Sequence, residues 1–363
     1  MEVKISSVGI AGLGLIGGSL AKAIRHQFPD IRIFGFDFSD VLKKAESQNL
    51  IDESLLIPNR LLECDLVILS LPIYSSLKLF EELYPQLTND QILIDVCSVK
   101  SPFINLKKKL QSNGKYLGLH PMAGKERSGL ENSDHLLFEN AVCFVCDDYR
   151  DDSTETTLNF LKCTGLRFTF IDAELHDKIV AEVSHLPQLV SVALVNSVSK
   201  SEDEFNYINF AGSGFRDMTR IASSNFDLWN EILMANKQNI ISSLESFKSE
   251  IKKIILNLQN DDFDSLKNQF ESANKNRNEI PLNNKGFIQP LFDLTVFLED
   301  KAGTLNKLTS LLAEQNINIK DIELLKIREG SGGNFRLYFD SAESAHKAYQ
   351  ILTENNFATN YTN

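Results

Sequence analysis

The stretch that decides the fold of this chain is VGIAGLGLIGG, residues 8–18. Its first four residues are small or apolar, as in a buried strand, and glycines end that strand. Gly12, Gly14 and Gly17 have the spacing that allows a tight turn, close approach of the backbone to a pyrophosphate, and tight packing of the following helix. We expect that helix to begin near Gly18, with its N-terminus facing an anion.

An acidic residue twenty positions beyond Gly17 makes this pattern more specific. Asp37 ends the strand-like run RIFGFD, where a carboxylate can accept hydrogen bonds from an adenosine ribose. The same charge would repel a 2′-phosphate, so the sequence predicts NAD rather than NADP. A structural glycine turn and a flavin site are the alternatives. The candidate cofactor-binding residues are Gly12, Leu13, Gly14, Leu15, Ile16, Gly17, Asp37, Ser70, Leu71 and Pro72.

Outward from this stretch, short aliphatic runs alternate with longer amphipathic ones, which is typical of strand–helix–strand units on a parallel sheet. We therefore expect an α/β Rossmann-type domain over residues 1–171. Its strands include Val8–Gly12, Arg32–Asp37, Leu66–Ser70, Ile92–Val96 and Ala141–Cys146.

The pattern changes after this domain. Apolar residues recur at helical spacing and no strand-like run appears for nearly a hundred residues, which predicts an all-α helical domain over 172–280. Residues 271–286 are polar, rich in Asn and Lys, and contain Pro281 and Gly286, which fits a helix end followed by a linker at 281–289. The order βαββαβ over 290–363 predicts an α+β ferredoxin-like domain.

The composition narrows the function classes. Of the 363 residues, 43% are hydrophobic and 24% charged, which suits two or three globular domains. Subtracting 49 acidic from 37 basic residues gives a net charge of −12, which disfavours nucleic acid and anionic membranes as partners. No run of about 18 apolar residues and no basic leader is present, so we expect a cytoplasmic protein.

The five cysteines do not point to a structural bond or a metal. Only Cys143 and Cys146 have a CxxC spacing, and no second pair completes a zinc site. We expect reduced thiols, mostly in the core, and no bound metal.

Two segments carry side chains suited to chemistry. His120, in the loop-like stretch GLHPMAGKERSG, precedes a proline and is a reasonable general base. Arg216 and Arg220, in AGSGFRDMTR, can hold a carboxylate with their forked guanidinium groups. The structural alternatives are a surface or capping histidine, and an arginine paired with Asp217. Between them, SHLPQ contains a proline that interrupts a helical pattern.

Together these segments resemble the prephenate and arogenate dehydrogenase family of tyrosine biosynthesis. The resemblance covers about residues 5–280 and rests on GLGLIGGS, DVCSVK, HPMAGKERSG, SHLPQ and GFRDMTRIA, with Trp229 nine residues after Arg220. It implies a homodimeric, NAD-dependent enzyme that oxidises and decarboxylates prephenate to 4-hydroxyphenylpyruvate.

The resemblance also implies residue roles. His120 would take the proton of the substrate's ring hydroxyl, Ser98 would hydrogen-bond the same hydroxyl, and Arg220 would anchor a carboxylate. Many family members have a second histidine at the end of SHLPH, whereas this chain has Gln188, whose amide can still form a hydrogen bond. The further candidate substrate-binding residues are Lys125, Glu126, Arg216, His185, Gln188 and Trp229.

Three other functions stay open at this point. An arogenate dehydrogenase would share the chemistry but bind an amine in place of the keto group. A catalytically silent amino-acid sensor would keep the folds without turnover. A β-hydroxyacid dehydrogenase would need a helix-borne lysine base that we cannot place.

The C-terminal segment 291–363 resembles an ACT regulatory domain through LTVFLEDKAGTLNKLTSLLAEQNINIKDIELL. Such domains pair side by side and bind an amino acid, so tyrosine is the expected effector. A packing module without an effector is the alternative. The resemblance implies the effector-binding residues Asp300, Gly303, Asn318 and Ile319.

Overall fold

The computed structural model describes residues 5–125, 127–146, 151–202, 205–279, 291–328 and 331–361. The chain divides into two compact units, Met1–Phe270 and Glu271–Asn363.

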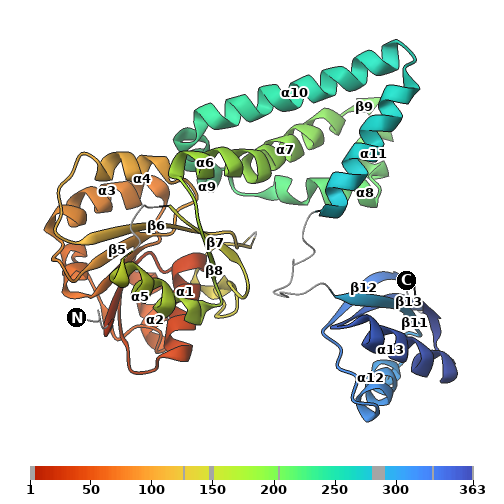
Figure 1. Cartoon of the computed structure of the whole chain (residues 1–363), viewed down its shortest axis with the longest axis horizontal. Coiled ribbons are helices and arrows are strands. Elements are labelled where there is room, and N and C mark those ends of the chain that lie inside the picture. The colour runs from red at the N-terminus through yellow and green to blue at the C-terminus, as the bar shows by residue number, and fades with distance from the viewer. Residues whose placement is uncertain are drawn as a thin grey trace. The chain divides into compact units, whose positions relative to one another are not determined.

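An eight-stranded sheet forms the first part of unit 1 (Figure 1). Its strand order is β3-β2-β1-β4-β5-β6-β7-β8. The strands are β1 (Ser7–Ala11), β2 (Arg32–Phe36), β3 (Glu53–Ser54), β4 (Leu66–Leu69), β5 (Ile92–Asp95), β6 (Lys115–Pro121), β7 (Val142–Val145) and β8 (Arg167–Phe170). Neighbours are parallel from β3 to β6, while β7 is antiparallel to β6 and parallel to β8. The predicted parallel α/β sheet is confirmed, with a reversed pair added at its edge.

Helices cover both faces of this sheet because side chains alternate along each strand. In β4, Leu66 and Ile68 enter one hydrophobic core, whereas Val67 and Leu69 enter the other. The first core takes side chains from α1 (Leu15–Gln27), α2 (Ser39–Ser47) and α5 (Asp152–Leu161), and the second from α3 (Ile73–Leu83) and α4 (Ser101–Lys107). Short 3-10 helices connect them: η1 (Pro58–Glu63), η2 (Tyr84–Gln86), η3 (Leu130–Asn132) and η4 (Lys162–Thr164).

Two local predictions need correction. Helix α1 begins at Leu15 rather than near Gly18, because the absence of side chains lets Gly17 and Gly18 lie within its first turns. His120 lies on strand β6 and pairs with Phe144 of β7, although we expected a loop. Glycine and proline are unfavourable in strands, and β6 contains one of each, which explains why its sequence did not read as a strand.

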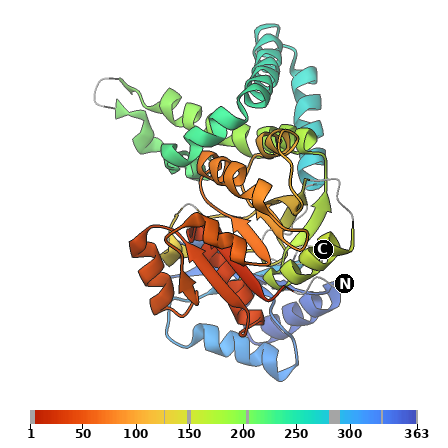
Figure 2. The same cartoon turned by 90° about the vertical axis from the view of Figure 1, so that its left-hand side faces the viewer.

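The second part of unit 1 is helical and extends away from the sheet (Figures 1 and 2). Its helices are α6 (Ala173–Val180), the π-helix η5 (Ala181–His185), α7 (Leu186–Val198), η6 (Tyr207–Phe210), α8 (Ser213–Thr219), η7 (Arg220–Ser223), α9 (Phe226–Ala235), α10 (Lys237–Gln259) and α11 (Phe263–Glu279), the last of which continues into unit 2. The predicted helical domain is confirmed, with one small addition: β9 (Ser201–Glu202) and β10 (Phe205–Asn206) form an antiparallel ribbon.

Residues Ala173–Val198 form one continuous helix through the π turn, long and apolar enough to cross a membrane by length and composition. The sequence has no uninterrupted apolar run here, because polar residues lie within the helix. Two of these, His176 and Asp177, are buried, and Asp177 accepts hydrogen bonds from the backbone of Lys100 in the sheet domain. The helix therefore packs against protein at its N-terminal half.

Unit 2 contains a four-stranded antiparallel sheet in the order β12-β13-β11-β14. The elements are β11 (Phe292–Leu298), α12 (Thr304–Glu314), β12 (Asp321–Arg328), β13 (Gly332–Phe339), α13 (Ala342–Glu354) and β14 (Ala358–Asn360). Leu308 and Leu312 of α12 and Leu352 of α13 pack against the sheet residues Val296 and Leu337. The predicted βαββαβ fold is confirmed, and the linker predicted at 281–289 lies outside the described residues.

Candidate active site

The glycine loop connects the carboxyl end of β1 to α1 and contacts the carboxyl end of β2. The Gly12 amide donates to the Phe36 carbonyl (2.9 Å), and the Leu13 amide donates to Asp37 Oδ2 (2.6 Å). Gly12 has φ +94°, and a Cβ there would lie 2.5 Å from the Ser70 carbonyl oxygen. Glycine is therefore required at position 12 both by the backbone conformation and by the close approach of the β4 end.

The same loop leaves room for an anionic ligand. Gly14 is the N-cap of α1, no side chain caps the helix, and its first turn contains no acidic residue. A Cβ on Gly14 would meet no atom within 4 Å, whereas one on Gly17 would lie 1.9 Å from the Gly12 carbonyl oxygen. The free amides of α1 and the open side of Gly14 fit a pyrophosphate.

The remaining cofactor candidates lie along the same sheet edge. Ser70, Leu71 and Pro72 link β4 to α3, and the Ser70 amide bonds the Ala11 carbonyl (2.7 Å). The sequence analysis missed apolar side chains beside Asp37: Phe38 is 80% exposed, and Leu56 is 82% exposed. Strand β3 pairs with β2. Phe38 and Leu56 therefore follow neighbouring strands, and they provide exposed apolar surface near the ribose position.

His120 occupies the end of β6, four strands along from β2 on this edge. It is partly exposed, and its Nδ1 lies 2.8 Å from Nε2 of His176, with the two rings nearly perpendicular at 76°. Ser98 lies in the loop after the adjacent strand β5. Among the described residues, no hydrogen bond joins Ser98 to His120.

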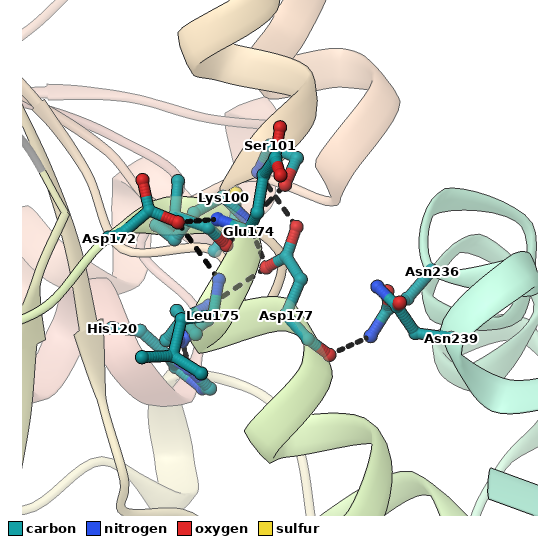
Figure 3. A network of polar contacts seen from close by, with 12 residues as sticks. Lys100, Ser101, His120, Asp172, Glu174, Leu175, Asp177, Asn236 and Asn239 are labelled. Carbon is teal, nitrogen blue, oxygen red and sulfur yellow. Dashed lines mark hydrogen bonds and ion pairs between the residues drawn. The ribbon is translucent and has the colours of Figure 1, made fainter. Parts of the chain in front are cut away.

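His176 is a site residue that the sequence analysis did not find. It is completely buried on α6, and its Nδ1 lies 2.8 Å from Asp177 Oδ1. That carboxylate also accepts the backbone N–H groups of Lys100 and Ser101, each at 2.8 Å (Figure 3). The only sequence signal was a polar His–Asp pair within an apolar helical pattern.

The charges of this network are set by burial and hydrogen bonding. Burial lowers the pKa of His120 well below its usual 6.5, and His176, Lys100 and His185 add to that effect. Burial alone would raise the pKa of Asp177, but hydrogen bonds from His176, Ser101 and Lys100 outweigh it and lower the pKa from its usual 3.8. At neutral pH, His120 is therefore neutral and Asp177 is an anion.

A buried ion pair supports the strand that carries His120. The ammonium of Lys100 contacts the Asp95 carboxylate and donates to the Leu119 carbonyl (2.8 Å). Tyr116 donates its hydroxyl proton to the other Asp95 oxygen at 2.6 Å. Both carboxylate oxygens and the ammonium thus have partners, as a buried pair requires.

His185 is the last residue of the π-helix, two positions before Pro187. Its ring contacts Trp229 edge-to-face, with 5.9 Å between the centroids, and its Nδ1 lies 3.3 Å from the Asn236 amide. Asn236 also donates to the Asp177 carbonyl at 2.7 Å. Burial lowers the pKa of His185 to about 4. His185, Trp229 and Asn236 therefore form one cluster with the network around Asp177.

Gln188 and the arginines occupy neighbouring helices. Gln188 is buried and donates to the Ile221 carbonyl (2.9 Å), which immediately follows Arg220. Arg220 begins η7 and is exposed, as is Arg216 on α8. The amide of Gln188 thus holds the segment that presents Arg220.

The other predicted residues lie apart from this network. Lys125 is 3.4 Å from Asp134, and Glu126 lies outside the described residues. In unit 2, Asp300, Gly303 and Asn318 are exposed. Gly303 has φ +88° and is the N-cap of α12, and Ile319 packs against the core of unit 2.

Comparisons with known proteins match all three parts of the chain. Residues 20–170 match the family model described as prephenate dehydrogenase, nucleotide-binding domain. Residues 172–272 match prephenate dehydrogenase, dimerization domain, and residues 292–354 match the ACT domain.

Individual proteins agree with these matches. The chain is 33% identical to the prephenate dehydrogenase of Bacillus subtilis over 97% of both chains. It is 31% identical to that of Lactococcus lactis, over 97% of this chain and 98% of the relative. The structure of prephenate dehydrogenase from A. aeolicus with hydroxyphenyl propionate and NAD+ has a TM-score of 0.71 and 28% identity, covering 77% of this chain and 99% of that chain. This chain therefore belongs to the prephenate dehydrogenase family, as an oxidoreductase of tyrosine biosynthesis with a C-terminal ACT domain.

Proposed function

We propose that this chain oxidises and decarboxylates prephenate with NAD, yielding 4-hydroxyphenylpyruvate, CO2 and NADH. The observation that carries the proposal is the position of His120, a neutral imidazole at the same sheet edge as the glycine loop. Its Nδ1 is occupied by His176, which leaves Nε2 for a substrate.

His120 would act as the general base. Nε2 accepts the proton of the ring hydroxyl while the carbon bearing that hydroxyl loses its hydride. Ser98, in the loop after β5, would hydrogen-bond the same hydroxyl. Loss of CO2 then makes the ring aromatic, which drives the reaction forward.

Arg220 would anchor a substrate carboxylate with its guanidinium fork. Gln188 contributes indirectly, because its amide bonds the residue after Arg220. Lys125 and Arg216 add positive charge for a substrate with two carboxylates, which the net charge of −12 would otherwise repel. Glu126, His185 and Trp229 would be further substrate-binding residues.

The residues at the glycine loop fit NAD. The free amides of α1 would bind the pyrophosphate, and Asp37 would bind the ribose hydroxyls. The exposed rings and chains of Phe38 and Leu56 would cover the adenine. When bound, NAD supplies the acceptor for the substrate's hydride.

The proposal is tested by following reduced nicotinamide with prephenate or arogenate, and with NAD or NADP, for the wild type and His120→Asn. We expect turnover of prephenate with NAD, reduced by about 10² to 10⁴-fold in the variant. Turnover of arogenate alone would keep the mechanism but change the substrate. Absence of turnover with either would make the chain an amino-acid sensor.

We further propose a cytoplasmic homodimer that binds tyrosine at the ACT domain through Asp300, Gly303, Asn318 and Ile319. The match to a dimerization domain and to an ACT domain supports this. Calorimetric titration of the full chain with tyrosine tests the effector site, since Asn318→Ala should weaken binding at this site while leaving NAD binding unchanged.

A further inference from the structure

We infer that His176, held by Asp177, is a positioning residue that fixes the tautomer of His120 and so leaves the Nε2 lone pair of His120 free to accept a proton. The inference rests on the proposed function of His120 as the base. It follows from the contacts of Asp177, His176 and His120, taken in that order.

The first step is the Asp177 carboxylate. Oδ1 accepts the Lys100 N–H and Oδ2 accepts the Ser101 N–H, both at 2.8 Å. These two backbone donors favour the ionised carboxylate, which can only accept hydrogen bonds. The third partner, His176 Nδ1, lies 2.8 Å from Oδ1 and must therefore be the donor.

The second step is the ring of His176. A neutral imidazole carries one N–H, and Asp177 has already fixed it at Nδ1. Nε2 of His176 is then an acceptor, and it faces His120 Nδ1 at 2.8 Å. His176 is completely buried, so water does not compete for this position.

The third step is His120 itself. Its Nδ1 must carry the proton, because two lone pairs at 2.8 Å would repel each other. The proton is then absent from Nε2, where the base must accept one. The opposite tautomer of His120 would require a proton on Nε2 of His176 in addition to the one on its Nδ1, and a neutral imidazole carries only one.

The network also spans two domains. His120 comes from β6 of the sheet domain, whereas His176 and Asp177 come from α6 of the helical domain. The two histidines are 56 residues apart in sequence. Asn236, at the start of α10, donates to the Asp177 carbonyl and holds α6 from the other side (Figure 3).

The test compares His176→Leu, which removes the acceptor, with His176→Gln, which keeps a carbonyl near the Nε2 position. His135→Leu is the matched control, since His135 is 45% exposed and contacts Asp134 instead. Each variant is labelled with ¹⁵N-histidine, and NMR reports which ring nitrogen of His120 carries the proton. His120→Asn identifies the His120 signals.

In the wild type and in His135→Leu, we expect the proton of His120 on Nδ1. In His176→Leu, the proton should move to Nε2, and kcat should fall on the order of 10²-fold with little change in KM or NAD binding. His176→Gln should recover part of kcat and the Nδ1 tautomer, which a merely structural defect would not do.

The outcomes separate this inference from the proposed function. If His176→Leu leaves both the His120 tautomer and kcat unchanged while His120→Asn abolishes turnover, His120 is the base and the positioning role is wrong. If His120→Asn retains full turnover, the base assignment itself fails. An Nε2-bound proton on His120 in the wild type would overturn the inference directly.

Discussion

The environment of His120 predicts a characteristic pH dependence for the proposed activity. A general base works in its unprotonated form, so a pKa of His120 below 6.5 keeps the base active under mildly acidic conditions. The charged or titratable groups facing it are Lys100, His176 and His185. We expect kcat/KM to stay level as the pH falls through 6.5, where an ordinary histidine would lose half its activity. A decline centred at pH 6.5 would contradict the lowered pKa of His120. His346→Asn, which removes an exposed histidine, is the control and should keep the wild-type pH profile.

His185 should make the native state sensitive to acid. Its pKa is about 4 in the folded chain and 6.5 when exposed, so between these values the unfolded chain binds the additional proton. Stability therefore falls as the pH drops through this window, by up to about 3 kcal/mol.

Trp229 provides the measurement, because it is the only tryptophan and it contacts His185. Urea unfolding followed by its fluorescence, at about pH 7.5 and about pH 5, should show a smaller pH effect in His185→Asn than in the wild type. His346→Asn, which removes an exposed histidine, is the matched control. An equal pH effect in the wild type and in His185→Asn would refute the lowered pKa of His185.

At the scale of elements, substitutions at two glycines of the same loop should have different effects, one on NAD binding and the other on stability. Gly14 has open space at its Cβ position, whereas a Cβ on Gly17 would collide with the Gly12 carbonyl. We expect Gly14→Ala to keep the melting temperature and weaken NAD binding. Gly17→Ala should lower the melting temperature by several degrees, because the loop and α1 must move apart. Calorimetry and NAD titration test the pair, and equal melting temperatures would contradict it.

The elements also show what sequence alone can predict. The glycine loop, Asp37 and the βαββαβ order are local patterns, so each could be read from neighbouring residues. Strand β6 was missed because Gly118 and Pro121 mask its alternation. The contact of His120 with His176 joins two domains, and no local pattern encodes such a contact.

At the scale of the whole molecule, the helical domain carries more exposed apolar surface than a monomer needs. On α10, Ile251, Ile254 and Ile255 are each at least 40% exposed, and Leu258 is 52% exposed. A surface of this kind normally meets a partner. The match to a dimerization domain supports a second copy of the chain.

We therefore expect Ile255→Asp to weaken dimerization by at least about tenfold, since it buries an unpaired charge in the interface. Ser249→Asp adds the same charge to the exposed polar surface of α10 and is the control. Sedimentation velocity across a concentration series measures both. An unchanged dimer in Ile255→Asp would place the interface elsewhere.

The division of the base network between two domains has a consequence for synthesis of the protein. The ribosome releases the sheet domain first, with the glycine loop, Asp37 and His120 complete, and domains generally fold as they emerge. His176 and Asp177 follow on α6, and Asn236 later still. On the proposed roles, a nascent chain can thus bind a dinucleotide before His176 and Asp177 have packed against His120, and catalysis begins only after the helical domain has folded.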